Sequence, residues 1–196
     1  MPCRHTHPWD RFRVARIWAP RPLHCLVVGE NPGSSTTPYF YDVERAVAVR
    51  TILLRELHAA GILTAPTLDA FRAAGFLFDH GIRCPLDDVT TDRRLARTYA
   101  SPRANAAVHL TPLIRKASSV WVMGHVARNA VAAAWPGFPR DRGDIARAPH
   151  PGPLPAAPTF FVSRYLTRTP AAELEAIVGA FTGFWRGRPD LGGGSG

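Results

Sequence analysis

Short apolar runs alternate along the chain with longer segments of helical pattern, and this alternation constrains the fold more than any other feature. A short apolar run that ends at a glycine is typical of a buried strand. We expect strands at Leu23–Val28, Gly75–Phe78 and Val120–Met123, with further candidates at Ile145–Ala148 and Phe160–Val162. We expect helices from Asp42 to about Gly61, over Pro102–Lys116 and His125–Ala134, and from Thr169 as N-cap to about Arg186. Strands separated by helices pair in parallel, so the pattern predicts a single-domain α/β fold with a central, mainly parallel β-sheet and helices on both faces.

The chain divides into three parts by composition. Its 196 residues suit one domain of this type. Residues 1–22 are rich in proline and arginine and predict a basic N-terminal arm. Residues 23–188 carry the alternating pattern and form the expected α/β domain. Residues 189–196 end in the low-complexity sequence GGGSG, which predicts a flexible tail or linker.

The charge balance favours a nucleic-acid partner. The formal net charge is +9, from 24 lysines and arginines against 15 acidic residues. A basic surface attracts polyanions, and phosphate contacts supply most nonspecific nucleic-acid affinity. No apolar run approaches the roughly 20 residues that cross a bilayer, which argues against a membrane partner. The three cysteines fit no disulfide framework and no zinc pair, so we expect reduced thiols in a cytosolic protein and no metal.

A first motif, LVVGENPGSS at Leu26–Ser35, includes the end of the first expected strand. Gly29 and Gly33 let the backbone turn sharply there and approach a ligand closely. Asn31 then lies at the mouth of a site, and Pro32 stiffens the turn. Ligands of open parallel sheets bind at the carboxyl ends of the strands, where this motif falls. Read alone, however, the motif is more often an ordinary turn between a strand and a loop.

A second motif, APHPGPLP at Ala148–Pro155, lies late in the chain. It offers an imidazole at His150, a rigid backbone framed by prolines, and one exposed leucine, Leu154. Read alone, it is typical of a proline-rich surface loop. The two motifs, in this order and at opposite ends of one α/β domain, are much more specific together than either is by itself.

The pair of motifs resembles those of the uracil-DNA glycosylase superfamily. GENPG at Gly29–Gly33 combines the glutamate of one branch with the Asn-Pro-Gly of the mismatch-specific and single-strand-selective branches. HPGPL at His150–Leu154 matches the family's HPSPL except that Gly152 replaces serine. VWVMGHVARNA at Val120–Ala130 is similar to the family's strand–glycine–helix segment. The resemblance implies a uracil-DNA glycosylase of base-excision repair, acting on single- or double-stranded DNA as a cofactor-free monomer in the bacterial cytosol.

The resemblance also implies catalytic roles. Asn31 would position the attacking water, although an amide cannot accept its proton as a carboxylate could. His150 would donate a hydrogen bond to uracil O2 as negative charge develops there. Cys84 matches one ligand of the iron–sulfur cluster that some relatives carry, but three cysteines cannot complete the cluster. Lys116, the only lysine, lies at an expected helix end away from both motifs, so we expect a monofunctional enzyme without a lyase step.

Contacts to the DNA backbone and duplex follow from the same resemblance. Leu154 would wedge into the duplex at the position of the flipped base. Pro151 and Gly152 would bring the backbone against phosphate, with one contact weakened by the missing serine hydroxyl. Ser34 and Arg147 are further expected DNA contacts because each lies in or beside a motif.

Base recognition is where the chain departs most from the family. Gly29, Glu30, Pro32 and Gly33 would line the base pocket, and Gly33 leaves room for 5-substituted uracils where relatives carry tyrosine. We expect Phe40 to stack on the base, with Tyr41 as the alternative. His80 takes the position of the family's base-reading asparagine, with Asp79 as the alternative reader. The Asp79 carboxylate could accept a hydrogen bond from the cytosine amine, so this departure leaves the exact base open.

Three other functions remain open from the sequence. One is a glycosylase directed at hypoxanthine or xanthine. Another is a non-catalytic protein of the same fold that binds damaged or single-stranded DNA. The last is a small-molecule α/β enzyme that binds a phosphate or nucleotide at the Gly29 turn, although the chain has neither a Walker sequence nor GxGxxG.

Overall fold

A computed structural model describes residues 7–32, 37–83, 102–138, 146–147 and 158–188. Its centre is a five-stranded sheet in the order β2–β1–β3–β5–β4. The strands are β1 (Cys25–Gly29), β2 (Phe76–His80), β3 (Ser119–Met123), β4 (Ala146–Arg147) and β5 (Thr159–Ser163). All are parallel except β4, which pairs antiparallel with β5 at one edge. The predicted α/β fold with a mainly parallel sheet is confirmed.

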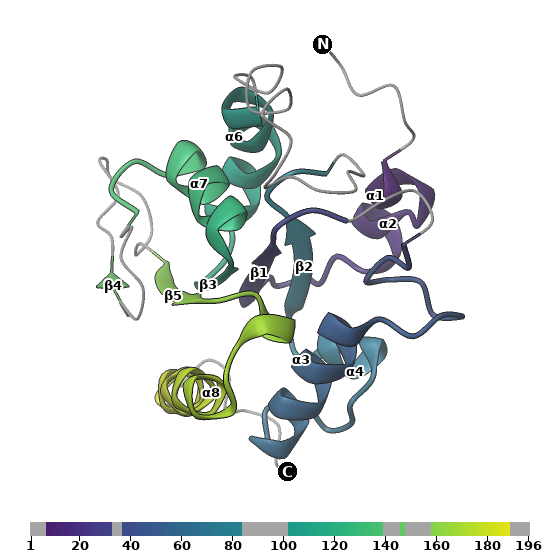
Figure 1. The fold of residues 1–196 in the computed structure, drawn as a ribbon, viewed down its shortest axis with the longest axis vertical. Coiled ribbons are helices and arrows are strands. Elements are labelled where there is room, and N and C mark those ends of the chain that lie inside the picture. Colours follow the sequence, from purple (N-terminus) through teal and green to yellow (C-terminus); the bar gives the residue numbers. More distant parts are fainter. Residues whose placement is uncertain (1–6, 33–36, 84–101, 139–145, 148–157, 189–196) are drawn as a thin grey trace.

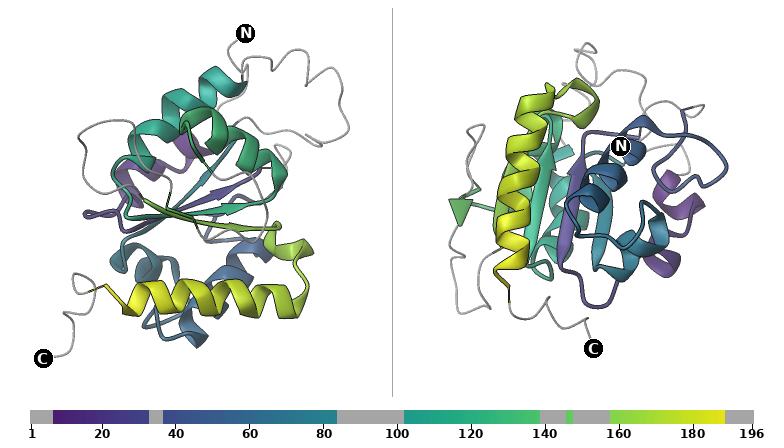
Figure 2. Two further views of the ribbon diagram at one scale, coloured as in Figure 1. Left: turned by 90° about the vertical axis from the view of Figure 1, so that its left-hand side faces the viewer. Right: turned by 90° about the horizontal axis from the view of Figure 1, so that it is seen from below.

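Helices cover both faces of the sheet (Figure 1 and Figure 2). On one face lie α6 (Pro102–Ile114) and α7 (His125–Ala134), which pack against each other. On the other face lie α3 (Ala48–Ala59), α4 (Leu68–Ala73) and α8 (Ala171–Arg186). Every residue of the four parallel strands is buried, as expected for a sheet with both faces covered. None of the helices in the described residues has the length and apolar character that crossing a membrane requires.

The N-terminal segment differs from the predicted arm. Residues 8–17 form two short helices, α1 (Pro8–Arg11) and α2 (Val14–Ile17), which lie beside β2 (Figure 1). Trp9 and Val14 are buried, and the Arg83 guanidinium lies 3.8 Å from the centroid of the Trp9 ring. The segment is basic, but its apolar residues join the core, so the prediction of an arm over residues 1–22 was wrong for the described part.

The helix expected from Asp42 begins six residues later. Val47 is the N-cap of α3, and Val43, which falls within the range predicted to be helical, lies before the helix and is 68% exposed. Asp42 does not cap α3, because its carboxylate accepts a hydrogen bond from Arg45 at 2.6 Å. The buried face of α3 consists of Val49, Leu53, Leu54 and Leu57. The helix α4 was not predicted, and the Thr67 hydroxyl caps its first turn by accepting a hydrogen bond from the Ala70 backbone nitrogen.

The remaining helix ends are close to those expected. The predicted bounds of α7 are confirmed, and α6 ends at Ile114 instead of Lys116. The N-cap of α8 is Pro170, not Thr169, whose hydroxyl instead donates a hydrogen bond to the Tyr165 carbonyl at 3.0 Å. The predicted end of α8 at Arg186 is confirmed.

The register of β4 places Arg147 relative to the two edges of the sheet. Both late strand candidates form strands, but β5 lies beside β3 while β4 lies outside β5. Arg147 pairs with Thr159, the first residue of β5. Arg147 therefore lies at the amino-terminal edge of the parallel strands, opposite the edge where β1 delivers Glu30 and Asn31.

Candidate functional site

A pocket of about 280 Å³ opens at the carboxyl ends of the parallel strands. Five residues that the sequence assigned to the site line it: Glu30, Asn31, Pro32, Phe40 and His80. The chain reaches the pocket directly after β1, again before α3, and at the last residue of β2. The structure therefore brings together residues that are up to 50 positions apart, at the edge of the sheet where ligands of such folds bind.

Gly29 was expected to allow a sharp backbone turn, but the structure needs a glycine there because the Phe78 ring leaves no space for a side chain. It is the last residue of β1 and is not among the glycines with a positive φ. A Cβ at Gly29 would lie 2.7 Å from the edge of the Phe78 ring, so the position has no space for a side chain. Backbone hydrogen bonds from Gly81 to the Gly29 carbonyl (2.8 Å) and from Ile82 to the Glu30 carbonyl (3.0 Å) extend the pairing of β1 and β2 into the pocket wall.

Glu30 places a nearly buried carboxylate between two adjoining pockets. Its side chain lines the 280 Å³ pocket and a smaller one of about 170 Å³ that opens beside α7. One carboxylate oxygen lies 3.5 Å from His125 Nδ1, and the other lies 3.7 Å from an Arg168 guanidinium nitrogen. The carboxylate also packs against Gly124, whose φ is +87°, and fills the space that a Cβ there would need. Asn31, beside Glu30, is half-buried and lines the larger pocket but not the smaller one.

The structure distinguishes between the two aromatic candidates. Phe40 lines the pocket and stacks on Phe78, with ring centroids 4.0 Å apart and an angle of 3° between the planes. Tyr41 does not line the pocket. Its hydroxyl donates to the Phe78 carbonyl at 3.1 Å and accepts from the Phe78 backbone nitrogen at 2.8 Å. Tyr41 therefore satisfies the backbone of the edge strand β2, and of the two aromatic candidates only Phe40 lines the pocket.

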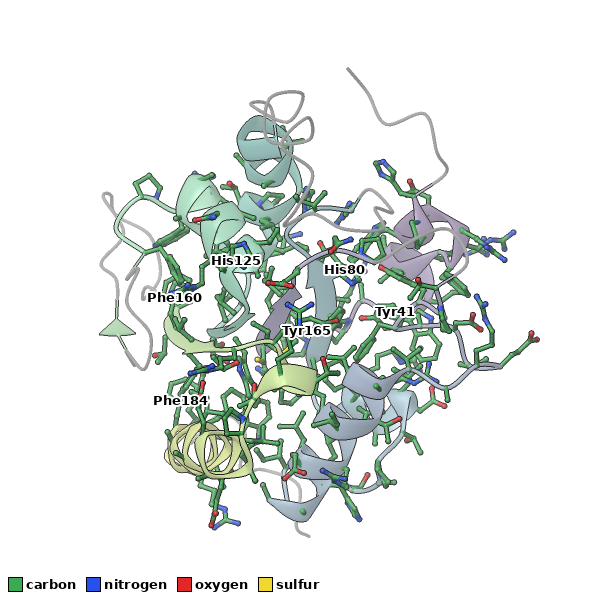
Figure 3. All side chains as sticks on the ribbon, viewed as in Figure 1. Tyr41, His80, His125, Phe160, Tyr165 and Phe184 are labelled. Carbon is green, nitrogen blue, oxygen red and sulfur yellow. The ribbon has the colours of Figure 1, made fainter. Side chains whose placement is uncertain are left out.

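His80 is the polar group that β2 brings to the pocket (Figure 3). Burial lowers its pKa to about 4, against a partly offsetting attraction from Asp79, so the ring is neutral at pH 7. Its backbone carbonyl accepts a hydrogen bond from His109 Nε2 at 2.9 Å. Both its Nδ1 atom and the hydroxyl of neighbouring Tyr39 are buried, and neither atom has a hydrogen-bond partner among the residues that the structure describes. Buried polar atoms are nearly always paired, so these two atoms indicate a place where a bound molecule or water completes the site.

The Asp79 carboxylate is paired with Arg83 and not with the pocket. This carboxylate is fully buried and accepts hydrogen bonds from Arg83 at 3.1 and 2.7 Å and from the His80 backbone nitrogen at 2.8 Å. It does not line the pocket, because alternate residues of a strand point to opposite faces. Of the two alternative readers, only His80 is therefore in position to contact a ligand in this pocket.

The pocket residues that the sequence did not predict include Tyr165 and Arg168. Both follow β5, in and next to the short helix η1 (Leu166–Arg168), and line both pockets. Tyr165 and His80 are both labelled near the centre of the view in Figure 3, and both line the 280 Å³ pocket. Burial, with the nearby Glu30 carboxylate, raises the pKa of Tyr165 to about 12, so its phenol keeps its proton. The available signal was an apolar strand followed by Ser-Arg-Tyr, at the same edge of the sheet as the first motif.

Several predicted site residues lie outside the described part of the chain. These are Gly33 and Ser34 of the first motif, and His150, Pro151, Gly152 and Leu154 of the second. Arg147 is described only as a residue of β4, at the amino-terminal edge of the sheet. Lys116 is exposed and shortly precedes β3, so it also lies at the edge opposite the pocket.

Comparison with known proteins does not assign the chain to a family. No protein-family model matches the chain, and no curated protein matches it.

Proposed function

We propose that the protein is a monofunctional DNA glycosylase that hydrolyses the bond between uracil and deoxyribose. One observation carries the proposal: Glu30, Asn31, Pro32, Phe40 and His80, selected from the sequence for this activity, line a single pocket at the carboxyl end of the sheet. The pocket's volume is at the lower end of the range for small-molecule sites, which suits a single flipped base.

The pocket has the chemistry for holding a base. The Phe40 ring offers an aromatic wall beside the half-buried amide of Asn31. The unpaired Nδ1 of His80 and the unpaired hydroxyl of Tyr39 can donate or accept hydrogen bonds at a polar edge of the base. Because His80 is neutral at pH 7, it can read that edge without the desolvation cost of a buried charge.

The reaction needs a water and a stabilised leaving group. The bond between C1′ and the base nitrogen breaks with its electron pair going to the base, and a water oxygen bonds to C1′ and loses a proton to solvent. In the proposal Asn31 orients this water, and His150 donates a hydrogen bond to the departing base. Leu154 fills the vacated position in the duplex. The roles of His150 and Leu154 rest on the motif resemblance alone.

A hypoxanthine- or xanthine-directed glycosylase is a second candidate because of His80. Asparagine offers a donor and an acceptor at fixed positions, whereas a neutral histidine beside a rotatable tyrosine hydroxyl can present either pattern. Such a pair is compatible with the adjacent N–H and C=O groups of uracil, hypoxanthine and xanthine alike.

The test is strand cleavage by alkali after incubation with end-labelled oligonucleotides that contain uracil, single-stranded or paired with guanine or adenine. We expect breaks only after alkali, and a loss of at least about tenfold in Asn31→Ala and His150→Ala. Asn129→Ala is the matched control, because Asn129 is exposed on α7 and lines neither pocket at the sheet edge. Breaks confined to hypoxanthine or xanthine substrates would support the second candidate. No breaks with any of these bases would contradict both and leave the non-catalytic DNA-binding protein.

A further inference from the structure

The pocket contains a cationic group that the motifs did not indicate. We propose that Arg168 contacts the departing base and stabilises the negative charge that develops on it, a role that rests on the proposed glycosylase function. Breaking the glycosidic bond leaves an electron pair on the base, and groups fixed near the developing charge stabilise the transition state.

Arg168 is the only arginine or lysine among the described residues that line the 280 Å³ pocket. The other polar groups there cannot supply positive charge at pH 7, since the His80 imidazole is neutral and phenols, amides, hydroxyls and carboxyls have no cationic form at this pH. A guanidinium also offers several N–H donors in a plane, which suits the carbonyl oxygens of a base.

The fold holds Arg168 at the pocket although its side chain is 68% exposed. The β5 strand lies beside β3 and ends at the same edge as β1, so η1 is delivered to the pocket. Leu166 anchors η1 in the core, and the Tyr165 carbonyl accepts hydrogen bonds from the Arg168 backbone at 2.8 Å and from the Thr169 hydroxyl. The nearly buried Glu30 carboxylate, 3.7 Å from the guanidinium, attracts it toward the pocket wall.

The competing interpretation is a surface ion pair between Arg168 and Glu30 with no role in the reaction. Exposed pairs contribute little to stability, so that interpretation predicts a nearly neutral substitution. Arg164 is a matched control because it is on the same segment and is 48% exposed. Its guanidinium pairs with Glu173 at 2.9 Å, and it lines only the smaller pocket, not the pocket proposed to hold the base.

The experiment measures single-turnover excision by the wild type, Arg168→Gln, Arg168→Lys and Arg164→Gln over a range of protein concentrations. The substrates are matched single-stranded oligonucleotides that contain uracil or 5-fluorouracil. Fluorine withdraws electrons and stabilises the base anion, so 5-fluorouracil needs less help from the protein. We expect Arg168→Gln to lower the maximal rate constant on uracil about 10- to 100-fold and on 5-fluorouracil clearly less. Arg168→Lys should keep part of the rate, and Arg164→Gln should stay within about twofold of the wild type.

Each contrary outcome has a distinct meaning. Equal losses on the two bases, or an Arg168→Gln rate equal to that of Arg164→Gln, would overturn the inference while leaving the glycosylase function intact. If Arg168→Gln raises the protein concentration needed for half-maximal rate but leaves the maximal rate unchanged, the inference is also overturned. Arg168 would then bind the DNA strand and not the departing base. An inactive wild type on every base would contradict the proposed function itself, and this inference with it.

Discussion

At the scale of single residues, burial decides which groups at the pocket carry charge. His80 is 4% exposed on a strand that is buried along its whole length, and the nearby charged or titratable groups that act on it are Asp79, Arg83 and His109. The cost of desolvating an imidazolium outweighs the attraction of Asp79, because Arg83 already neutralises that carboxylate. The β2 side of the pocket therefore presents a neutral hydrogen-bonding edge, and the charged groups of the pocket are the Glu30 carboxylate and the Arg168 guanidinium.

The depressed pKa of His80 predicts a loss of stability on acidification. The folded-state pKa is about 4 and the ordinary value is 6.5, so the unfolded chain binds a proton first as pH falls. The contribution of His80 is constant above pH 6.5, declines between pH 6.5 and 4, and changes no further below 4. The full shift corresponds to about 3 kcal/mol. Urea unfolding of the wild type and His80→Gln at pH 7 and 4.5 should show a smaller pH dependence in the variant, and equal dependence would contradict the burial argument.

A second prediction at this scale concerns Gly124. Its φ of +87° disfavours any side chain, and the Glu30 carboxylate occupies the place of a Cβ. Gly124→Ala should lower the free energy of unfolding by about 1–3 kcal/mol. Gly179→Ala is the control, because Gly179 lies inside α8 with open space at its Cβ position, and it should raise stability by about 0.5–1 kcal/mol. Equal effects of the two substitutions in urea unfolding would show that Gly124 has no special requirement.

At the scale of elements, the N-terminal helices are part of the wall behind the site. The Trp9 ring packs on Arg83, which in turn pairs with the buried carboxylate of Asp79 beside His80. The Phe12 ring stacks on Tyr39 at a centroid distance of 5.4 Å, and Tyr39 lines the pocket. Two short helices thus support the side of the pocket formed by β2, although neither carries a site residue.

Removing the Trp9 ring should therefore destabilise the protein strongly. Trp9→Ala should cost about 3 kcal/mol in urea unfolding, because it creates a cavity and uncovers one face of a buried ion pair. Ile17→Ala, at a residue that is 43% exposed on α2, should change stability by less than about 0.5 kcal/mol. A small effect at Trp9 would indicate that the N-terminal helices do not belong to the folded core.

At the scale of the whole molecule, the net charge of +9 predicts salt-sensitive binding to nucleic acid. Each phosphate contact releases counterions, so affinity falls steeply with salt. Binding of a fluorescent single-stranded oligonucleotide should weaken by on the order of tenfold between 50 and 200 mM salt, if about three phosphates are contacted. A neutral polymer of similar length is the control and should not bind. Salt-independent oligonucleotide binding would contradict an electrostatic interface.

Local patterns determined the framework of this protein. The apolar runs at Cys25–Gly29 and Ser119–Met123 could form little other than buried strands, and α7 was predicted to the residue because Gly124 and Pro136 limit it. The first motif was expected at the carboxyl end of the first strand, and Glu30, Asn31 and Pro32 do lie there. Their position follows directly from β1, because they are the next residues in the chain. These features depend on residues that are neighbours in the chain.

Tertiary contacts decided the rest. Phe40 rather than Tyr41 faces the pocket because Tyr41 bonds the backbone of β2, 37 positions away. His80 rather than Asp79 does so because Arg83 and the strand's alternation turn the carboxylate away. Arg168 joins Asn31 only because β5, and not β4, pairs with β3. Neighbouring residues such as Phe40 and Tyr41, or Asp79 and His80, could each have faced the pocket as far as the local sequence is concerned. Contacts with residues distant in the chain made one of the two arrangements lower in free energy.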